Sequence, residues 1–199
     1  MDSRQVRLLV IGGDRFGDYH ERQLRRAGYG EALEVVRSDW APALADWLSA
    51  ASPDDQLVPA PLSPHFLRDW LRSAVGGVAL EPPRGWSLPF EVLGSDGSLY
   101  LSAAAWTCPA TCVEPAHCPA LHAPRDWDLA SIIEEGAAER GFEAAVFRVL
   151  HFAAGVATVP AVSLLTARDR LRSLSGVRVV VATSSRCHAA LGSFLVPSG

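Results

Sequence analysis

The chain has 199 residues, of which 49% are hydrophobic and 20% charged, enough apolar material for the core of one domain. Its 18 Lys and Arg against 22 Asp and Glu give a formal net charge of −4. Nucleic-acid binding requires a basic excess that this chain lacks, so we expect no nucleic-acid partner.

The N-terminal segment MDSRQVRLLVIGG runs directly into an apolar strand and lacks the features of a secretory signal. We therefore expect a cytoplasmic location, where thiols stay reduced. The apolar stretch 149–167 is almost long enough to span a bilayer, but it contains Gly155 and Pro160 and divides into a strand, a glycine turn and a helix. We expect a buried strand–helix unit there and no membrane association.

Strands and helices are predicted to alternate in the first part of the chain. Apolar runs predict strands at 6–13, 32–37 and 55–60, and helical periodicity predicts helices at 15–28, 42–51 and 63–75. This β-α-β-α-β-α order is typical of a parallel, doubly wound sheet.

The alternation breaks in the middle of the chain. Residues 90–106 predict a hairpin that turns at 95–97, and a loop rich in cysteine follows. A helix at 128–141, a strand at 144–152, a helix at 159–173 and a strand at 177–185 then restore the order. We predict a single α/β domain over 1–199: a Rossmann-like, doubly wound, mostly parallel sheet with a β-hairpin and cysteine-loop insertion at roughly 82–127.

The segment GGDRFG lies between the first predicted strand and helix, where a dinucleotide-binding fingerprint would lie. Gly12 and Gly17 match two glycines of G-x-G-x-x-G, but Asp14 replaces the middle one and would repel a pyrophosphate. Asp39 stands about where a ribose-binding acid would. A nucleotide site that holds NAD(P) with these residues and Gly13 is one hypothesis, and a tight turn in which Asp14 caps the helix is the favoured alternative.

Cys108, Cys112 and Cys118 share one short loop, and Cys187 follows the last predicted strand. Thiolates are preferred ligands of Zn²⁺ and of iron–sulfur clusters. The C-x3-C-x5-C spacing lacks the C-x2-C pair of a zinc knuckle, whereas proline directly after cysteine recurs at iron–sulfur clusters. Loops after strand carboxyl ends gather at one edge of an open α/β sheet. We therefore expect the four thiols to meet there if the strand before Cys108 runs in the parallel sense.

Histidines supply reserve ligands: His188, which follows Cys187, and also His117 and His122 could each provide the one histidine of a Cys3His zinc site. Two hypotheses without a metal remain open, namely redox-active or sensor thiols, and cysteines without a special role. The thiol hypothesis has less support, because only Arg186 beside Cys187 supplies a cationic neighbour.

The segment CPATCVEPAHCP, with the later ATSSRCHAAL, resembles a sparsely characterised prokaryotic family of Rossmann-like proteins. That family carries a Cys-Pro-x-x-Cys-x-Glu-Pro…Cys-Pro loop and a terminal Cys-x-Cys-His-Gly. The four cysteines, Glu114 and His188 match this pattern, whereas Ser185 and Ala189 stand where a cysteine and a glycine are expected. The resemblance implies a site with thiols enough for one cubane cluster or one Zn²⁺, and it implies no reaction.

The sequence thus predicts a cytoplasmic metalloprotein whose Cys-ligated centre lies at the carboxyl edge of the sheet. An iron–sulfur cluster is preferred to zinc, and its role is electron transfer, redox sensing or an accessory one. A nucleotide-dependent oxidoreductase using the GGDRFG loop and a zinc-stabilised binding module without catalysis are the alternatives. A redox partner protein and a homo-oligomer are compatible with the first hypothesis. No catalytic motif is present, so no catalytic residue is assigned.

Overall fold

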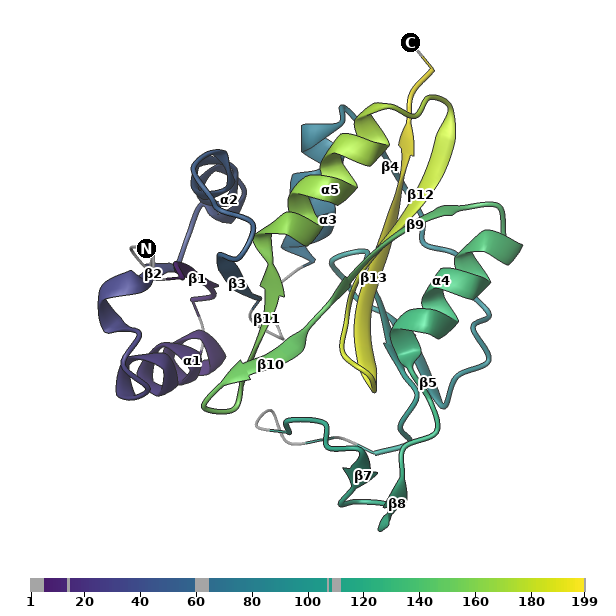
Figure 1. Cartoon of the computed structure of the whole chain (residues 1–199). Coiled ribbons are helices and arrows are strands. Elements are labelled where there is room, and N and C mark those ends of the chain that lie inside the picture. Colours follow the sequence, from purple (N-terminus) through teal and green to yellow (C-terminus); the bar gives the residue numbers. More distant parts are fainter. Residues whose placement is uncertain (1–5, 14, 60–64, 107, 109–111, 199) are drawn as a thin grey trace. The chain divides into compact units, whose positions relative to one another are not determined.

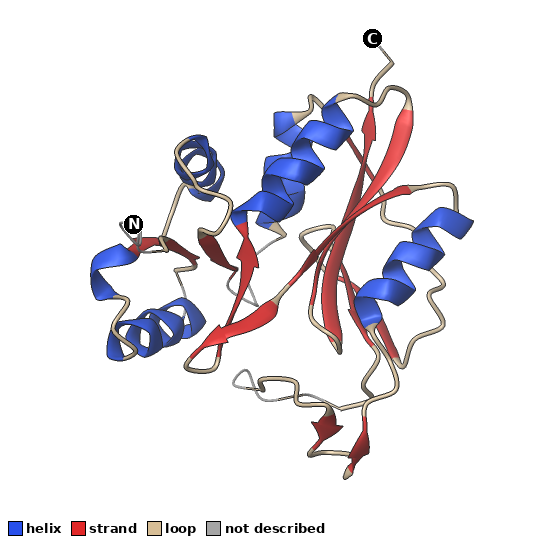
Figure 2. Cartoon of the chain, in the orientation of Figure 1, coloured by secondary structure: helices blue, strands red, loops and turns tan. Residues whose placement is uncertain are grey.

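The computed structural model describes residues 6–13, 15–59, 65–106, 108 and 112–198. The chain divides into two compact units. Unit 1 comprises Met1–Ser63 and Leu150–Thr166, and unit 2 comprises Pro64–Val149 and Ala167–Gly199. The helices and strands of each unit are drawn in Figures 1 and 2. The prediction of one domain over 1–199 is not tested by this division and stays a prediction.

Unit 1 is built on a sheet with the strand order β10-β11-β3-β1-β2. Its strands are β1 (Leu8–Ile11), β2 (Leu33–Val36), β3 (Gln56–Pro59), β10 (Leu150–Ala153) and β11 (Val156–Pro160). β1 pairs in parallel with β2 and β3, whereas β11 pairs antiparallel with β3 and with β10. Only part of this sheet is therefore parallel.

Helices connect the parallel strands of unit 1. They are α1 (Arg15–Arg26), the short 3-10 helix η1 (Gly30–Ala32) and α2 (Trp40–Ser49). Leu24 of α1 packs against Val10 and Val58 in the core. α1 and α2 lie on opposite sides of strands β1, β2 and β3 (Figure 1), and α2 buries Leu44 and Trp47. The predicted β-α-β-α-β order is thus observed from β1 to β3.

Unit 2 contains a mixed sheet in the order β5-β6-β13-β12-β9, with β4 paired to β13. Its strands are β4 (Val78–Leu80), β5 (Phe90–Leu93), β6 (Leu99–Ser102), β9 (Glu143–Arg148), β12 (Val177–Ser184) and β13 (His188–Val196). β13 pairs antiparallel with β12 and with β6, whereas β12 and β9 are parallel. Because β13 opposes both neighbours, β6 and β12 run in the same direction and end at the same edge.

Helices α3 (Phe66–Ala74) and α4 (Leu129–Glu139) lie on opposite sides of this sheet (Figure 1), and α5 (Ala161–Arg172) crosses the boundary between the units in sequence. Ile133 of α4 packs in a core cluster with Val180 of β12. Helices on both sides explain why four consecutive residues of β12, from 179 to 182, are buried.

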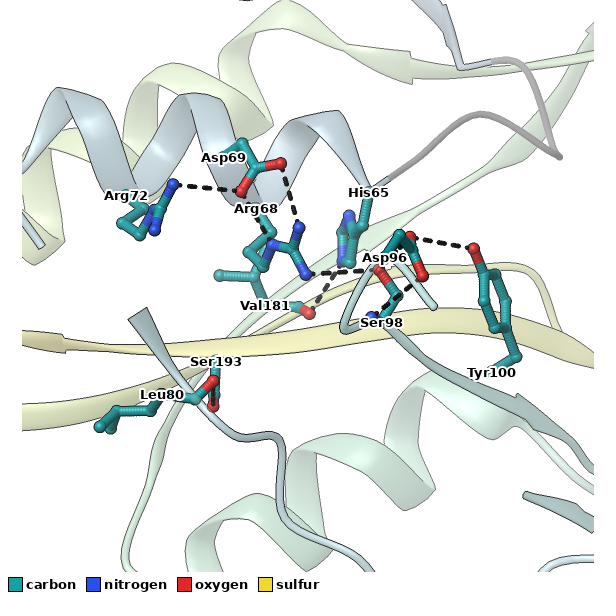
Figure 3. A network of polar contacts seen from close by, with 10 residues as sticks. All are labelled: His65, Arg68, Asp69, Arg72, Leu80, Asp96, Ser98, Tyr100, Val181 and Ser193. Carbon is teal, nitrogen blue, oxygen red and sulfur yellow. Dashed lines mark hydrogen bonds and ion pairs between the residues drawn. The ribbon is translucent and has the colours of Figure 1, made fainter. Parts of the chain in front are cut away.

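A network of polar contacts ties α3 to the β5–β6 hairpin (Figure 3). Arg68 donates to Asp69 at 3.0 Å and to the Ser98 hydroxyl at 3.3 Å. The Asp96 carboxylate, in the predicted turn, accepts hydrogen bonds from the hydroxyls of Ser98 and Tyr100 at 2.8 and 3.2 Å. These groups satisfy one another, so the network anchors the hairpin to the helix.

The cysteine loop lies between β6 and α4 and has little regular structure. β7 (His117–Cys118) and β8 (Ala123–Pro124) pair as a minimal antiparallel ladder. The described residues 112–116 and 125–128 belong to no helix or strand. Few backbone hydrogen bonds therefore hold the loop.

The prediction of a Rossmann-like, doubly wound and mostly parallel sheet is wrong, because the strands form a mixed α/β arrangement with antiparallel and mixed sheets. β12 is not the last strand of the chain: a turn follows it, and the chain then forms β13, which pairs antiparallel with β12. β13 was not predicted, since Ala189, Ala190, Gly192 and Ser193 lack the β-branched character of a strand. The antiparallel β10–β11 pair is a second departure from parallel order.

The apolar stretch 149–167 does not form one continuous element. It contains β10, β11 and the first part of α5. Among the described residues, no helix has the length and apolar character needed to cross a membrane.

Candidate metal centre

Cys187 lies in the turn that connects β12 to β13, at the edge where β6 also ends. Ser185 closes this turn: its N–H donates to the His188 carbonyl at 2.9 Å, and its hydroxyl oxygen accepts the N–H groups of Cys187 and His188 at 3.3 and 3.1 Å. The Cys187 carbonyl accepts the N–H of Ala103, just beyond β6, at 2.9 Å. Cys187 is therefore buried and tied to the strand that leads into the cysteine loop.

Glu114 joins the cysteine loop to this turn. Its carboxylate accepts hydrogen bonds from the backbone N–H groups of Arg186 at 2.8 Å and of Cys187 at 3.3 Å. Glu114 itself adopts a left-handed φ of 51°, a backbone conformation that is uncommon for a non-glycine residue. The two segments that carry the cysteines are thus in direct contact.

Cys118, in β7, is buried, and the backbone N–H groups of Ala120 and Leu121 interact with its sulfur. Burial by itself raises the pKa of the Cys118 thiol, but these N–H groups and the guanidinium of Arg125 outweigh it and lower the pKa below its ordinary value. Cys118 is therefore suited to act as a thiolate, the form of cysteine that binds metals.

Cys108 and Cys112 are half-buried, and all four thiols are free. Burial raises the pKa of the Cys108 thiol, and negative charge on Cys187, Cys112 and Cys118 raises it further. The four cysteines are therefore close enough to influence one another's ionisation, although Cys187 comes from a distant part of the sequence.

Arg125 is the buried cation of this region, with only 8% of its surface exposed. Its Nη1 donates to the carbonyl of Pro115, whereas Nε and Nη2 form no hydrogen bond of normal geometry among the described residues, although the guanidinium interacts with Cys187 and Cys118. Burial would lower the pKa of Arg125, but Cys187, Glu114 and Cys118 raise it above its ordinary value. The guanidinium thus faces the sulfur atoms and stays charged.

Two tryptophans also turn their indole N–H groups toward the cysteines. Trp106 interacts with Cys108 and Trp127 with Cys187, and the two rings meet edge to face with centroids 6.4 Å apart. Within the described part of the chain, neither indole nitrogen forms a hydrogen bond of normal geometry, so these contacts with sulfur are long or poorly aligned. Burial raises the pKa of Cys187, and Trp127 offsets part of that effect. These donors favour ionised sulfur, but burial outweighs them at Cys108 and Cys187, where the pKa of the thiol stays above its ordinary value.

Of the histidines proposed as reserve ligands, His188 lies nearest to the buried turn. It is half-buried at the start of β13, and burial lowers its pKa. Its Nε2 is buried and finds no partner among the residues described. His117 and His122 are exposed on the loop.

The thiols share one region but do not occupy coordinating positions. No group of three or more His, Cys, Asp or Glu side chains in the described residues is arranged to hold a metal ion. Residues 109–111, which separate Cys108 from Cys112, lie outside the described residues.

The residues predicted to bind a nucleotide lie in unit 1. The N–H of Gly12 donates to the carbonyl of Val36 at 3.1 Å. A Cβ on Gly17 would lie 2.5 Å from the Gly12 oxygen, so α1 packs closely on the loop. Asp39, with φ of 53°, is exposed before α2, and Asp14 lies outside the described residues.

The remaining glycine of the loop, Gly13, approaches the next strand–helix connection. A Cβ there would lie 2.9 Å from the Arg37 carbonyl oxygen. The Arg37 guanidinium forms ion pairs with Asp18 and Glu21 of α1. The start of α1 thus carries carboxylates that an incoming phosphate would meet. An NAD(P) site stays a prediction.

A family model described as "Uncharacterized protein, C-terminal domain" matches residues 45–196. The comparisons with curated proteins and with solved structures found no significant match. The matched range includes all four cysteines and excludes the glycine loop. The family description names neither a ligand nor a reaction.

Proposed function

The chain belongs to the family described as "Uncharacterized protein, C-terminal domain", and we propose that it binds one metal centre. Cys108, Cys112, Cys118 and Cys187 supply the ligands. The centre is an iron–sulfur cluster in preference to zinc, and it serves electron transfer or redox sensing.

The observation that carries this proposal is the contact between Glu114 and the Cys187 turn. The Glu114 carboxylate lies 2.8 Å from the N–H nitrogen of Arg186 and 3.3 Å from that of Cys187. A loop with little regular structure is thereby held against a buried thiol on a rigid β-hairpin. Contacts of this kind support metal ligands from outside the coordination sphere, and binding of the metal would bring the thiols into coordinating positions.

The buried donors give independent support. Nε and Nη2 of Arg125 and the indole nitrogens of Trp106 and Trp127 interact with the cysteines but form no hydrogen bond of normal geometry among the described residues. Unpaired buried donors are costly, and neutral thiols are weak acceptors. Metal binding deprotonates thiols and leaves negative charge on sulfur. Ionised sulfur in a bound centre would thus be a stronger acceptor for these donors than the thiols that they already approach.

The choice of an iron–sulfur cluster rests on two features. Cys108 and Cys118 are each followed by proline, a pattern that recurs at such clusters. Donors directed at sulfur also tune the reduction potential of a cluster, so they have a function in a redox centre that they lack in a purely structural one.

Zinc is the second candidate, and the small size of the β7–β8 ladder favours it. Each of its strands has 2 residues, too few to form an independently stable hairpin. A structural zinc ion would provide the missing stability, as it does in small zinc modules.

Elemental analysis of the full chain, purified without oxygen, tests the proposal. We expect about one centre per chain, with a brown protein and sulfide for a cluster, or a colourless protein with one zinc. Cys187→Ser and Cys118→Ser should lose the metal. Arg186→Gln, which changes an exposed side chain in the same turn, should keep it. Metal-free wild type that binds neither Zn²⁺ nor reconstituted iron and sulfide would overturn the proposal.

A further inference from the structure

β5 is an end strand of the sheet in unit 2, and β6 is the one strand of the described residues that pairs with it. The N–H of Gly94 donates to the carbonyl of Ser98 at 2.8 Å, so these two residues form a hydrogen-bonded pair. Such pairs alternate with non-hydrogen-bonded pairs along an antiparallel ladder. Val92, two positions before Gly94, therefore directs its N–H and C=O groups toward β6, whereas Glu91 and Leu93 direct theirs away from it.

The outer edge of β5 is thus an open row of backbone donors and acceptors. Among the described residues, no backbone group forms a hydrogen bond with the outward N–H and C=O groups of Glu91 or Leu93. Three of the side chains of the strand are also apolar and exposed: Phe90 by 46%, Val92 by 47% and Leu93 by 37%. An exposed apolar edge of this kind pairs readily with another strand unless charged side chains prevent it.

Glu91, the only charged residue of β5, does not protect this edge. Its carboxylate accepts the backbone N–H groups of Gly85 and Trp86, each at 2.8 Å. Glu91 stands opposite Leu101 in the ladder, so its side chain lies on the face of the sheet that α4 covers. The strand therefore lacks the projecting charge with which edge strands usually avoid pairing.

The outward groups of β5 match those of a second copy of the chain in one register. In an antiparallel pair, each outward residue must face an outward residue. A two-fold axis through Val92 meets this condition: Glu91 faces Leu93 of the second copy on both sides of the axis, which gives two hydrogen-bonded pairs. An axis through Glu91 would place two carboxylates opposite each other. An axis through Leu93 would give one hydrogen-bonded pair, because the next outward residue, Ser95, belongs to the turn.

The side chains also fit in this register. Val92 faces Val92 of the second copy in a closely spaced, non-hydrogen-bonded pair, with Cα atoms about 4.5 Å apart. Phe90 faces Gly94 of the second copy, and an aromatic side chain opposite an edge glycine stabilises a strand pair. Gly94 cannot carry a side chain of its own, because a Cβ there would lie 2.6 Å from Asp96 Oδ1 and from the Tyr100 ring. The ring of Phe90 would therefore cover backbone that the other copy leaves partly exposed.

We propose that two copies of this chain associate through β5, in antiparallel pairing about a two-fold axis at Val92, so that the sheet of unit 2 continues from one copy into the other. The inference does not depend on the metal centre. Each copy contributes a strand of 4 residues, whereas a standard protein interface has about 20–30 residues a side. We therefore expect a reversible dimer with a dissociation constant in the micromolar range or above.

Sedimentation velocity of the reduced, full-length chain tests the pairing at concentrations from about 1 μM to about 1 mM, the range in which weak complexes dissociate. Val92→Lys places two ammonium groups opposite each other at the axis, and it should raise the dissociation constant at least about tenfold. Val162→Lys is the matched control, because it makes the same change on a valine of α5 that is 44% exposed. Its dissociation constant should match that of wild type.

Opposite charges at the axis should restore the pairing. Val92→Lys and Val92→Glu should each stay monomeric where wild type is dimeric, whereas their equimolar mixture should form a dimer, because an ammonium group then faces a carboxylate. Such a result distinguishes the β5 pair from association through another surface. Wild type that stays monomeric at every concentration would overturn the inference. So would Val92→Lys that dimerises like wild type, or a mixture that stays monomeric.

Hydrogen exchange of the wild-type chain decides the question if Val92→Lys does not fold, as judged by circular dichroism. The outward N–H groups of Glu91 and Leu93 should exchange at least about fivefold more slowly at the high concentration than at the low one, because only the dimer gives them a partner. The N–H of Val92, which is directed toward β6, should exchange at the same rate at both. Equal rates for Glu91 and Leu93 at the two concentrations would contradict the pairing.

Discussion

Glu114 and Cys187 are in direct contact although 73 positions separate them in the sequence: the Glu114 carboxylate accepts the backbone N–H of Cys187 at 3.3 Å. The same carboxylate accepts the N–H of Arg186 at 2.8 Å. Hydrogen bonds to an ionised acceptor are stronger than neutral ones. This contact therefore determines how the cysteine loop lies on the β12–β13 turn.

Replacing Glu114 by glutamine should weaken metal binding without abolishing it. The amide keeps the shape but loses the charge, and changes to residues that support metal ligands typically lower affinity about 10- to 100-fold. Competition with a coloured chelator measures the affinity. Glu135→Gln, at an exposed position of α4, is the control. If the metal affinity of Glu114→Gln lies within about twofold of that of wild type, the Glu114 contact does not support the metal ligands.

Metal binding should protect the cysteine loop from proteolysis. Among its described residues the loop has only the β7–β8 ladder as regular structure, so a bound centre would provide most of the order of that part. We expect trypsin to cleave after Arg125 at least about tenfold faster in the metal-free chain than in the loaded chain. Cleavage after the exposed Arg26, at the end of α1, should be the same in both. Mass spectrometry of the fragments distinguishes the two sites, and equal rates after Arg125 would count against the prediction.

His65 should make unit 2 sensitive to mild acid. Burial lowers the pKa of His65 from 6.5 to about 4, while its Nε2 lies 3.0 Å from the Val181 carbonyl oxygen. The unfolded chain, with the ordinary pKa, binds the proton first, so protonation favours unfolding. The contribution of neutral His65 to stability is complete above pH 6.5 and declines as the pH falls from 6.5 toward 4. The total loss is roughly 3 kcal/mol.

Urea unfolding at several pH values tests the role of His65. In His65→Gln the unfolding free energy should depend less on pH over this window, whereas His122→Gln, at an exposed position, should keep the wild-type slope. A His65→Gln slope equal to that of wild type would show that other groups cause the acid sensitivity.

Gly17→Ala should destabilise unit 1, although alanine normally stabilises a helix relative to glycine. The added Cβ would lie 2.5 Å from the Gly12 carbonyl oxygen, a backbone atom that cannot move independently. Overpacking of this kind costs about 1–3 kcal/mol. Gly30→Ala is the control, because the nearest atom to its Cβ would be Arg25 Nη1 at 3.7 Å. A higher thermal midpoint for Gly17→Ala than for wild type would contradict the predicted clash.

Much of the local structure could be predicted from the sequence. The elements from β1 to α3, the hairpin that turns near residues 95–97, and α4 lie within a few residues of their predicted positions. These elements depend on periodicity, caps and turn residues that are close together in the chain. β13 could not be predicted in this way, because its small residues gain their burial from β6 and β12 on either side.

By itself, the sequence determined which chemistry is available: four cysteines, three of them in one loop, and a glycine-rich turn after the first strand. Only the tertiary structure decided how Cys187 meets the cysteine loop, because β13 reverses the chain and so brings the ends of β6 and β12 to one edge. The tertiary structure alone also decided that Arg125 and the two tryptophans lie beside the cysteines. A buried donor without a partner is a property of its surroundings, and those surroundings come from segments far apart in the chain.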